Sequence, residues 1–337
     1  MTEKLLTIAI PTFNRVAKLE NLIASIIPQL TPLVEILVSD NASTDGTTEL
    51  MISLGAKSSS IRYVRQSTNV GIDRNVDSAV INAFGKYVWI CGDDDEFESF
   101  AIEYILGILN CDEFATGWVN CSRWDASLKE CWSPKIVDLD NDILDADIGE
   151  VISVSHIKFT FLSAHIVRRD LWHAAKSRER CFVPPFTDCI WMVGHLLAGV
   201  NGKNFIVARP LLRQRSSEYD NITVAKAPIL LNWCRVMKMA VDLGVPQVDV
   251  EPFFNVTANG PHLINSIIHK KRFAPEIAMQ EFIPTVTFFW RYPRFWFTAA
   301  PLHLMPGWVI SGLRSVYRWQ LKLGGIQVKL RDKQIKK

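Results

Sequence analysis

Three consecutive carboxylates, Asp93, Asp94 and Asp95, follow a run of apolar residues that ends at Cys91. Like charges this close repel one another, so the cluster is stable mainly where a cation neutralises it. Carboxylate oxygens suit Mg²⁺ or Mn²⁺, which take one or two protein carboxylates and complete their shell with water and phosphate. The cluster therefore predicts a metal site that faces a phosphate ligand. A solvated acidic turn capping the next helix is the alternative.

A second polar segment, Asp40-Asn41-Ala-Ser43-Thr-Asp45-Gly, follows another apolar run. An acidic side chain at the end of a strand can accept a hydrogen bond from a nucleobase N–H or a ribose hydroxyl. Asn41, Ser43 and Asp45 also suit an Asx turn and the cap of a following helix. We expect the first role for Asp40 and leave the second open for its neighbours.

Two further segments carry polar groups that suit a phosphorylated ligand. Pro11-Thr12-Phe-Asn14-Arg15 begins at the end of the first apolar run, and Gly71-Ile-Asp-Arg74-Asn75 lies at the start of a helical pattern. A guanidinium near a helix start can meet a phosphate with two hydrogen bonds. A surface ion-pair partner within the helix is the alternative for Arg74.

The elements that position these residues alternate between short β-rich runs and amphipathic stretches, the pattern of a mostly parallel sheet covered by helices. Open sheets of this class bind ligands outside the carboxyl ends of their strands, and three polar segments lie at such ends. The expected strands are Leu5–Ile10, Glu35–Ser39, Ile61–Arg65 and Tyr87–Cys91, and the expected helices span residues 16–29, 45–54, 72–84 and 99–109.

The rest of the chain is expected to complete the sheet and then to become helical. Strands are expected near 114–121, 161–167 and 205–209, a helix near Asp188, and mainly helices from about 225. The predicted domains are an α/β domain over 1–220, with halves at 1–110 and 111–220, and a helical region over 221–337.

Charge is distributed unevenly along the chain. Ten basic residues and one acidic residue follow Glu281, a net charge of +9, whereas 27 basic and 34 acidic residues up to that point give −7. The basic segment also holds most of the aromatic residues of the C-terminal region, which suits the headgroup layer of an anionic membrane. The alternative is a helical subdomain that packs its aromatics against the core or against a second copy of the chain.

Cellular location is predicted from what precedes the first expected strand and from the cysteines. The apolar run before Pro11 is too short for a signal peptide. Seven cysteines, with no C-x-x-C pair, favour free thiols in a reducing compartment. We expect a cytoplasmic protein, peripheral on the inner face of the cytoplasmic membrane, with no nucleic-acid partner.

In their order along the chain, these segments resemble the inverting glycosyltransferases of family 2. The resemblance covers about 110 residues and implies a GT-A fold, a nucleotide-sugar donor and a divalent metal, Mg²⁺ or Mn²⁺. It implies that 1–220 is the catalytic domain, with the nucleotide-sugar half at 1–110 and the acceptor half at 111–220. It implies metal ligation by Asp94 and Asp95. The residues that it places around the donor are Pro11, Thr12, Asn14, Arg15, Asp40, Asn41, Gly71, Arg74, Asp93 and Asp94.

One departure from the family pattern affects the acidic cluster. The family's acidic run opens with an aspartate, and Gly92 takes that place here. The family also keeps a catalytic base, an Asp or Glu, at the start of a helix in the second half of the domain. Asp188, in Thr187-Asp188-Cys-Ile-Trp, matches that context and is the expected base. A helix N-cap is the alternative role for Thr187 or Asp188.

The resemblance is greatest to bacterial surface-polysaccharide enzymes, including an abequosyltransferase-like group. We therefore expect inverting transfer of a sugar from a nucleotide diphosphate to a polyprenyl-diphosphate-linked saccharide, in O-antigen or capsule synthesis. A nucleotidyltransferase is the first alternative, although such an enzyme needs a Gly-rich basic loop after the first strand. A non-catalytic sugar-nucleotide-binding protein is the second. The oligomeric state stays open.

Overall fold

The computed structural model describes residues 3–175, 179, 181–182, 187–216, 229–306 and 308–309. The chain divides into two compact units. The first comprises Met1–Tyr219 and Ile229–Val256, and the second comprises Asp220–Pro228 and Thr257–Lys337.

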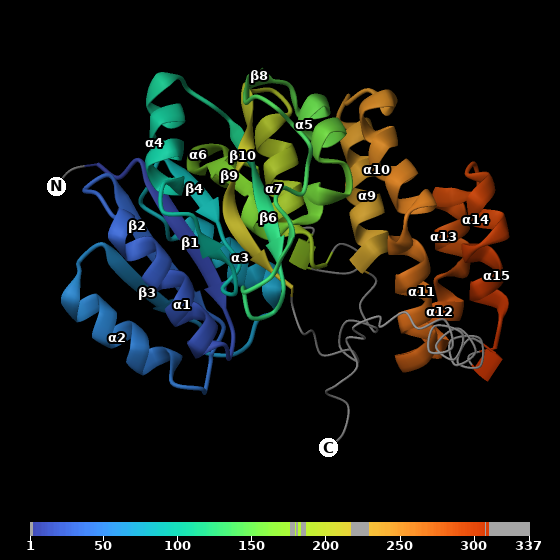
Figure 1. The fold of residues 1–337 in the computed structure, drawn as a ribbon, viewed down its shortest axis with the longest axis horizontal. Coiled ribbons are helices and arrows are strands. Elements are labelled where there is room, and N and C mark those ends of the chain that lie inside the picture. The colour runs from blue at the N-terminus through green and yellow to red at the C-terminus, as the bar shows by residue number, and fades with distance from the viewer. Residues whose placement is uncertain are drawn as a thin grey trace. The chain divides into compact units, whose positions relative to one another are not determined.

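One mixed sheet forms the centre of the first unit (Figure 1), with strand order β3-β2-β1-β4-β9-β6-β10-β5, while β7 pairs with β6 and β8 with β10. Helices flank this sheet, which gives the α/β class that the sequence predicts. The strands are β1 (Leu6–Thr12), β2 (Val34–Asp40), β3 (Ile61–Arg65), β4 (Tyr87–Ile90), β5 (Glu96–Phe97), β6 (Thr116–Trp124), β7 (Cys131–Ser133), β8 (Ile143–Ala146), β9 (His165–Arg168) and β10 (Asn204–Arg215).

The N-terminal half of the sheet is parallel, as predicted. β1 pairs in parallel with both β2 and β4, and β2 pairs in parallel with β3. Every residue of β1 and β2 is buried, which explains why both strands are mostly apolar rather than alternating. The polar side chains inside them bond one another, with the Thr7 hydroxyl donating to Glu35 Oε1 at 2.6 Å. The register places Thr12 opposite Asp40, so both strands end at the same edge.

The second half of the sheet is mixed in direction. β9 lies antiparallel between β4 and β6, whereas β10 runs parallel to β6. The sequence pattern locates β6, β9 and β10 approximately but not β5, β7 or β8. These three strands have two to four residues each, too short for a periodic signal.

Helices at all four positions expected in the N-terminal half are present. The helices that begin within the first unit are α1 (Val16–Ile26), α2 (Thr47–Lys57), α3 (Ile72–Ile81), α4 (Ala101–Cys111), α5 (Ile148–Ser155), α6 (Arg169–Ala174), α7 (Ile190–Gly199), α9 (Ile229–Asp242) and α10 (Gln247–Asn259). Short 3₁₀ turns occupy Ile27–Gln29, His156–Thr160 and Leu162–Ala164.

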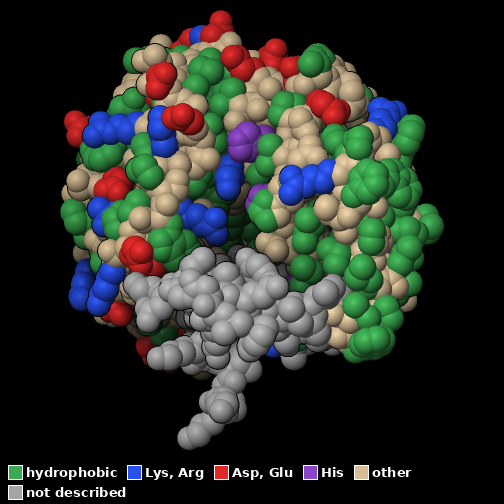
Figure 2. All heavy atoms as spheres, turned by 45° about the vertical axis from the view of Figure 1, so that its right-hand side comes forward, with side chains coloured by type: hydrophobic (Ala, Val, Ile, Leu, Met, Phe, Trp, Pro, Cys, Tyr) green, Lys and Arg blue, Asp and Glu red, His purple; other side chains and the backbone are tan. Residues whose placement is uncertain are grey.

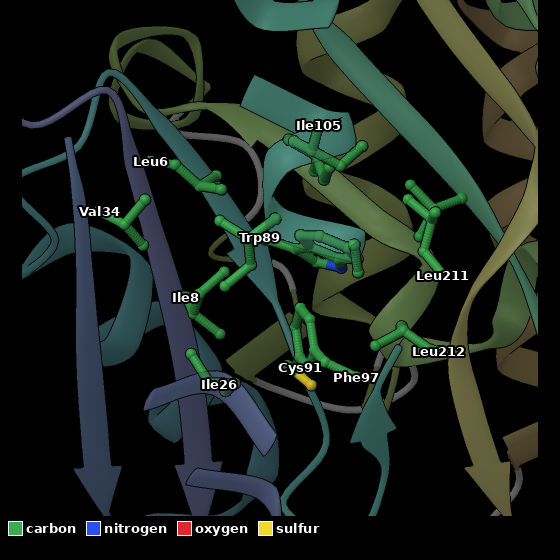
Figure 3. Packing of buried hydrophobic residues seen from close by; sticks show 14 of the residues in the cluster. Leu6, Ile8, Ile26, Val34, Trp89, Cys91, Phe97, Ile105, Leu211 and Leu212 are labelled. Carbon is green, nitrogen blue, oxygen red and sulfur yellow. The ribbon is translucent and has the colours of Figure 1, made fainter. Parts of the chain in front are cut away.

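The hydrophobic core lies between the sheet and its helices (Figure 3). Trp89 of β4 packs against Phe97 at 4.7 Å between ring centroids, and the Trp89 indole N–H donates to the Ser163 carbonyl. At Gly85, just before β4, a Cβ would lie 2.6 Å from the backbone nitrogen of Thr7. Only glycine therefore allows this close approach of the chain to β1.

The second unit is helical in its described part, and the helical character predicted for the C-terminal region is confirmed there. Its helices are α11 (Pro261–Phe273), α12 (Pro275–Gln280), α13 (Phe282–Phe289), α14 (Pro293–Phe297) and α15 (Ala299–Leu304). A buried Lys270 and Glu281 pair joins α11 to the start of α13 at 2.5 Å. Within the described residues, no helix combines the length and apolar character needed to cross a bilayer.

Candidate active site

The acidic cluster lies directly after β4 and contacts the end of β1. The Thr12 hydroxyl donates to Asp93 Oδ2 at 2.7 Å, and Arg15 Nη1 donates to Asp93 Oδ1 at 3.0 Å. Arg15 also lies 3.5 Å from Asp94, and Lys18 Nζ lies 3.8 Å from the same carboxylate. Two cations from the β1–α1 segment therefore offset the repulsion between the carboxylates that the sequence implies.

Burial distinguishes the three aspartates from one another. Asp93 is 5% exposed, and its burial raises its pKa although Arg15 acts in the opposite direction. Burial raises the pKa of Asp95 to about 8, and the neighbouring Asp94 charge adds to the shift. The Asp94 side chain is the most accessible of the three, with 15% exposure. Asp94 is thus the carboxylate that a ligand reaches most easily.

Asp95 uses both carboxylate oxygens within the protein. The Ser163 hydroxyl donates to Oδ2 at 2.5 Å, and the backbone N–H of Arg215 donates to Oδ1 at 3.1 Å. Arg215 Nε also donates to the Asp94 carbonyl, and its Nη2 pairs with Glu96. Arg215, at the end of β10, therefore holds the acidic loop from the side of the second half-sheet.

Gly92, where the family pattern has aspartate, donates its N–H to Ser163 Oγ at 2.8 Å. A Cβ at this position would meet Ser163 Oγ at 3.4 Å and oxygens of Asp94 and Asp95 at 3.6 Å. These are ordinary contact distances, so packing does not require a glycine here.

Asp40 closes the turn after β2. Its carboxylate is fully buried, with Oδ1 accepting from the Ser43 backbone N–H at 2.8 Å and Oδ2 accepting from the Tyr63 hydroxyl at 2.6 Å. Arg65 Nε lies 3.4 Å from Oδ2. The Asx turn considered from the sequence is made by Asp45, whose Oδ1 accepts from the backbone N–H of Thr47 at 3.3 Å and from its hydroxyl at 2.6 Å at the start of α2. The nucleobase role of Asp40 remains a prediction.

The loops after β1, β2 and β3 are fastened to one another by amide side chains. Asn14, at φ 53°, donates its N–H to Ser43 Oγ and accepts from the Thr44 N–H. Asn41 donates to Asn69 at 2.9 Å and accepts from the Val70 N–H at 2.8 Å. Gly71 follows at φ 86°, a conformation that glycine adopts without strain. These contacts set where α3 begins.

The first turn of α3 connects the strand ends to the rest of the site. Asn75 donates to the carbonyls of Thr12 and Ser39, at 3.3 and 3.0 Å. Arg74 lies with its guanidinium carbon 4.4 Å from the centroid of the Phe182 ring. Asp73, on the same turn, bonds the segment that carries Asp188.

Asp73 accepts hydrogen bonds from three successive backbone N–H groups. Its Oδ2 accepts from Asp188 at 2.6 Å, and its Oδ1 accepts from Cys189 at 3.0 Å and Ile190 at 2.9 Å. Asp73, a residue of α3, thus caps the N-terminus of α7. The cap that the sequence suggested for Thr187 or Asp188 is provided by another helix instead. Burial raises the pKa of Asp73 to about 6, against the effect of these hydrogen bonds.

Asp188 itself has a left-handed backbone, with φ 58°. Burial raises the pKa of its carboxyl, while a hydrogen bond from Thr187 acts in the opposite direction. A carboxylate with a raised pKa accepts a proton more readily than an exposed one.

Helix α9 supports the same segment from the other side. Asn232 Nδ2 donates to the Thr187 carbonyl at 2.8 Å, and the Trp233 indole donates to the Asp188 carbonyl at 3.3 Å. No local sequence pattern connects α9 with Asp188, because 45 residues separate Trp233 from Asp188. Asp73, Ser163 and Asn232 were likewise not identified from the sequence as residues of the site. For Asp73 a signal existed, because this acidic residue directly precedes Arg74 in the motif.

The structure therefore brings most of the predicted residues into one connected region. Hydrogen bonds link Thr12, Arg15, Asp93 and Asp94 at the ends of β1 and β4, and α3 joins this cluster to the turn of Asp188. Pro11 lies on β1 directly before Thr12. An anionic ligand at the strand ends would face Arg15 and Lys18, with carboxylates available for a metal ion or a proton.

Sequence comparison identifies relatives of the N-terminal half. Residues 7–166 match the family model described as Glycosyl transferase family 2. Abequosyltransferase RfbV of Salmonella typhimurium is 32% identical over 182 residues, 50% of this chain and 54% of that protein. A GalNAc(5)-diNAcBac-PP-undecaprenol beta-1,3-glucosyltransferase of Campylobacter jejuni is 31% identical over 157 residues, 44% of this chain and 50% of that protein. The chain thus spans about half the length of these curated relatives.

Solved structures extend the likeness of fold. TarS 1-349 of S. aureus in complex with UDP-GlcNAc gives a TM-score of 0.59 at 13% identity, over 84% of this chain and 86% of that one. A mannosyltransferase of Pyrobaculum calidifontis in complex with GDP-Man and Mn²⁺ gives 0.51, over 94% of this chain and 88% of that one. The fold is of the GT-A type.

Proposed function

We propose that this chain transfers a sugar, with inversion, from a nucleotide diphosphate to a hydroxyl of a lipid-linked saccharide, because residues 7–166 match the model of glycosyl transferase family 2. One observation carries the proposal above all others. The ends of β1 and β4 gather Thr12, Arg15, Asp93 and Asp94 into one hydrogen-bonded cluster, and α3 connects it to Asp188.

The donor occupies the carboxyl ends of β1, β2 and β4 in this proposal. Arg15 and Lys18 provide positive charge for the diphosphate, while Pro11, Thr12 and Asn14 line the approach. Asp40, Asn41 and Gly71 shape the loops around the nucleoside, and Arg74 meets a phosphate after leaving the Phe182 ring. In this proposal Asp40 accepts a hydrogen bond from the base or the ribose after its bond with Ser43 or Tyr63 breaks and exposes the buried carboxylate.

Mg²⁺ or Mn²⁺ fits the acidic cluster because such ions need few protein ligands. Among the described residues, no three His, Cys, Asp or Glu side chains gather into a complete metal cage. Asp94 is the accessible carboxylate, and Asp93 or Asp95 is its partner. When bound, the ion neutralises charge that develops on the departing diphosphate. Asp95 can bind the ion only after its hydrogen bond from the Ser163 hydroxyl or from the Arg215 backbone N–H breaks.

Asp188 is the base in this proposal. The acceptor oxygen forms a bond to the anomeric carbon, the bond from that carbon to the diphosphate oxygen breaks, and the electron pair leaves with the diphosphate. The proton of the acceptor hydroxyl passes to the Asp188 carboxylate. Arg15 and Lys18 remain beside the leaving diphosphate and offset its negative charge.

The acceptor class is inferred from the relatives. The Campylobacter relative is named for an undecaprenol-linked saccharide and the Salmonella relative for abequose transfer. We assign this chain a polyprenyl-diphosphate-linked acceptor in O-antigen or capsule synthesis on the same grounds.

The donor assignment is tested by a panel of nucleotide sugars and nucleoside diphosphates. We expect one nucleotide class to raise the thermal unfolding temperature in the presence of Mn²⁺, with less effect in EDTA. A ligand at 100 times its dissociation constant adds about 2.7 kcal/mol to the free energy of unfolding. If no nucleotide diphosphate changes the unfolding temperature, the donor assignment is wrong.

The second unit provides a surface suited to a membrane, where lipid-linked acceptors reside. Its exposed apolar side chains include Ile283, Trp290, Trp296, Phe297 and Leu304, and Phe297 is 84% exposed. Hydrophobic side chains gather on the side of the molecule that carries α13–α15, which comes forward in Figure 2. Arg291, stacked on Trp290, adds positive charge. Most of the basic tail lies outside the described residues.

A triple variant tests this surface. Replacing Trp290, Trp296 and Phe297 by serine is expected to lower binding to vesicles that contain phosphatidylglycerol by at least about tenfold, because aromatic burial at the interface is lost. Flotation of the protein with vesicles measures the effect. Ile52→Ser, at a 65% exposed position of α2, is the matched control and should bind like the wild type. Unchanged flotation of the triple variant would exclude this surface as the membrane contact.

A further inference from the structure

Asp73 is a buried carboxylate in the first unit to which the family resemblance gives no role. It is 6% exposed and lies in the first turn of α3, next to Arg74. All the hydrogen bonds described for its side chain come from the backbone of Asp188, Cys189 and Ile190. The carboxylate therefore acts on the segment that carries the proposed base.

Residues 188–190 need hydrogen bonds to another part of the chain because of their backbone conformation. Asp188 has a φ of 58°, a region that few residues other than glycine adopt, although Asp and Asn tolerate it best. The N–H groups at the start of α7 have no partner within their own helix. A single carboxylate that accepts all three N–H groups holds the left-handed residue and the first turn of α7 as one unit.

The same turn of α3 is fixed to the donor side of the sheet. Asn75, two residues after Asp73, donates to the Thr12 and Ser39 carbonyls at the ends of β1 and β2. Asp73 and Asn75 thus set the distance between the strand ends and the turn of Asp188 through one rigid helical turn.

We infer that Asp73 is a positioning residue, which fixes the carboxylate of Asp188 relative to the donor. This inference rests on the proposed function, in which Asp188 is the base. Asp73 does not touch substrate; it acts through the backbone of residues 188–190. Displacing a catalytic group by about 1 Å can lower a rate by about 10²-fold, so the effect on turnover is expected to be large.

The experiment is a double-mutant cycle of Asp73→Asn with Asp188→Asn. The amide keeps one acceptor oxygen but turns an N–H₂ group towards a backbone N–H, so the segment must shift. We expect Asp73→Asn to lower kcat about 10- to 100-fold, with the Kd of the donor within about threefold of wild type. In the Asp188→Asn background, Asp73→Asn should cause no further loss of kcat.

Asp77→Asn is the matched control, because Asp77 lies one turn further along α3, is buried, and accepts from the Trp172 indole. It should keep the kcat of the wild type. If Asp73→Asn does not fold, Asp73→Glu, which keeps the charge but moves the oxygens, should give the same fall in kcat.

The outcomes separate this inference from the function on which it rests. Wild-type kcat in Asp73→Asn or Asp73→Glu, with Asp188→Asn inactive, overturns the role of Asp73 alone. A higher Kd of the donor at unchanged kcat would also overturn the positioning role of Asp73, because the substitution would then act on donor binding through the neighbouring Arg74. If Asp188→Asn retains activity, Asp188 is not the base and the proposed mechanism itself is wrong.

Discussion

Replacing Asp188 by asparagine is expected to lower kcat by about 10²- to 10⁴-fold, while the Kd of the nucleotide donor stays within about twofold of wild type. Asparagine keeps the size of the side chain and tolerates the left-handed backbone, so the Asp73 contacts to the segment are preserved. It has no carboxylate to accept the proton of the acceptor hydroxyl. Initial rates of nucleoside diphosphate release measure kcat, and calorimetry measures the donor Kd.

The same variant should change the pH dependence. A base must be ionised, so activity is present above its pKa and is lost as the pH falls through it. Burial raises the pKa of Asp188 above its ordinary value of 3.8, so the acid limb attributable to it should lie above that pH in the wild type. Asp188→Asn should lack this limb. Asp170→Asn, at an exposed position of α6, should behave like the wild type. Activity of Asp188→Asn near the wild-type level would contradict the assignment.

Replacing Asp94 by asparagine is expected to weaken Mn²⁺-dependent donor binding by at least about 100-fold and to lower kcat/KM correspondingly. Asp94 is the most accessible of the three aspartates, and its loss removes a charged oxygen ligand. Without metal or donor, the variant should unfold close to the wild-type temperature, because Arg15 still pairs with Asp93. Calorimetry of donor binding with Mn²⁺ and with EDTA separates the metal contribution.

Two neighbouring substitutions identify the partner of Asp94. Asp93→Asn should abolish Mn²⁺ dependence if Asp93 and Asp94 hold the ion, and Asp95→Asn should do so if the pair is Asp94 and Asp95. Asp95→Asn should also destabilise the fold, since Ser163 and the Arg215 backbone bond that carboxylate. Asp145→Asn, with its side chain 87% exposed, serves as the surface control. Undiminished Mn²⁺ dependence in Asp94→Asn would rule out this residue as a ligand.

Local patterns were sufficient to predict the N-terminal half of the sheet. The strands over 34–40 and 87–90 lie where mostly apolar runs precede polar turns, because buried parallel strands leave no polar face. The strand over 61–65, at the edge of the sheet, is only partly buried and carries Arg62 and Arg65. Gly71 was recognised as part of a motif, and the structure shows that its positive φ favours glycine at this position.

Local sequence patterns could not predict the long-range contacts of the site. Ser163 bonds Asp95 across 68 residues, Arg215 bonds it across 120, and Asp73 bonds Asp188 across 115. No periodicity or spacing in one sequence encodes such pairs. For the same reason the alternative considered for Thr187 or Asp188 was a cap of their own helix, whereas the acceptor at the start of α7 is Asp73 of α3.

Product analysis with the wild-type protein tests the central claim most directly. The protein is incubated with the nucleotide sugar that stabilises it, with Mn²⁺ and with polyprenyl-diphosphate-linked saccharide, and the product is examined by NMR. We predict release of nucleoside diphosphate and one new glycosidic bond whose anomeric configuration is opposite to that of the donor. Release of pyrophosphate would indicate nucleotidyl transfer, and a retained configuration would exclude single displacement by an acceptor activated at Asp188. Donor binding without any new bond would contradict the glycosyltransferase assignment.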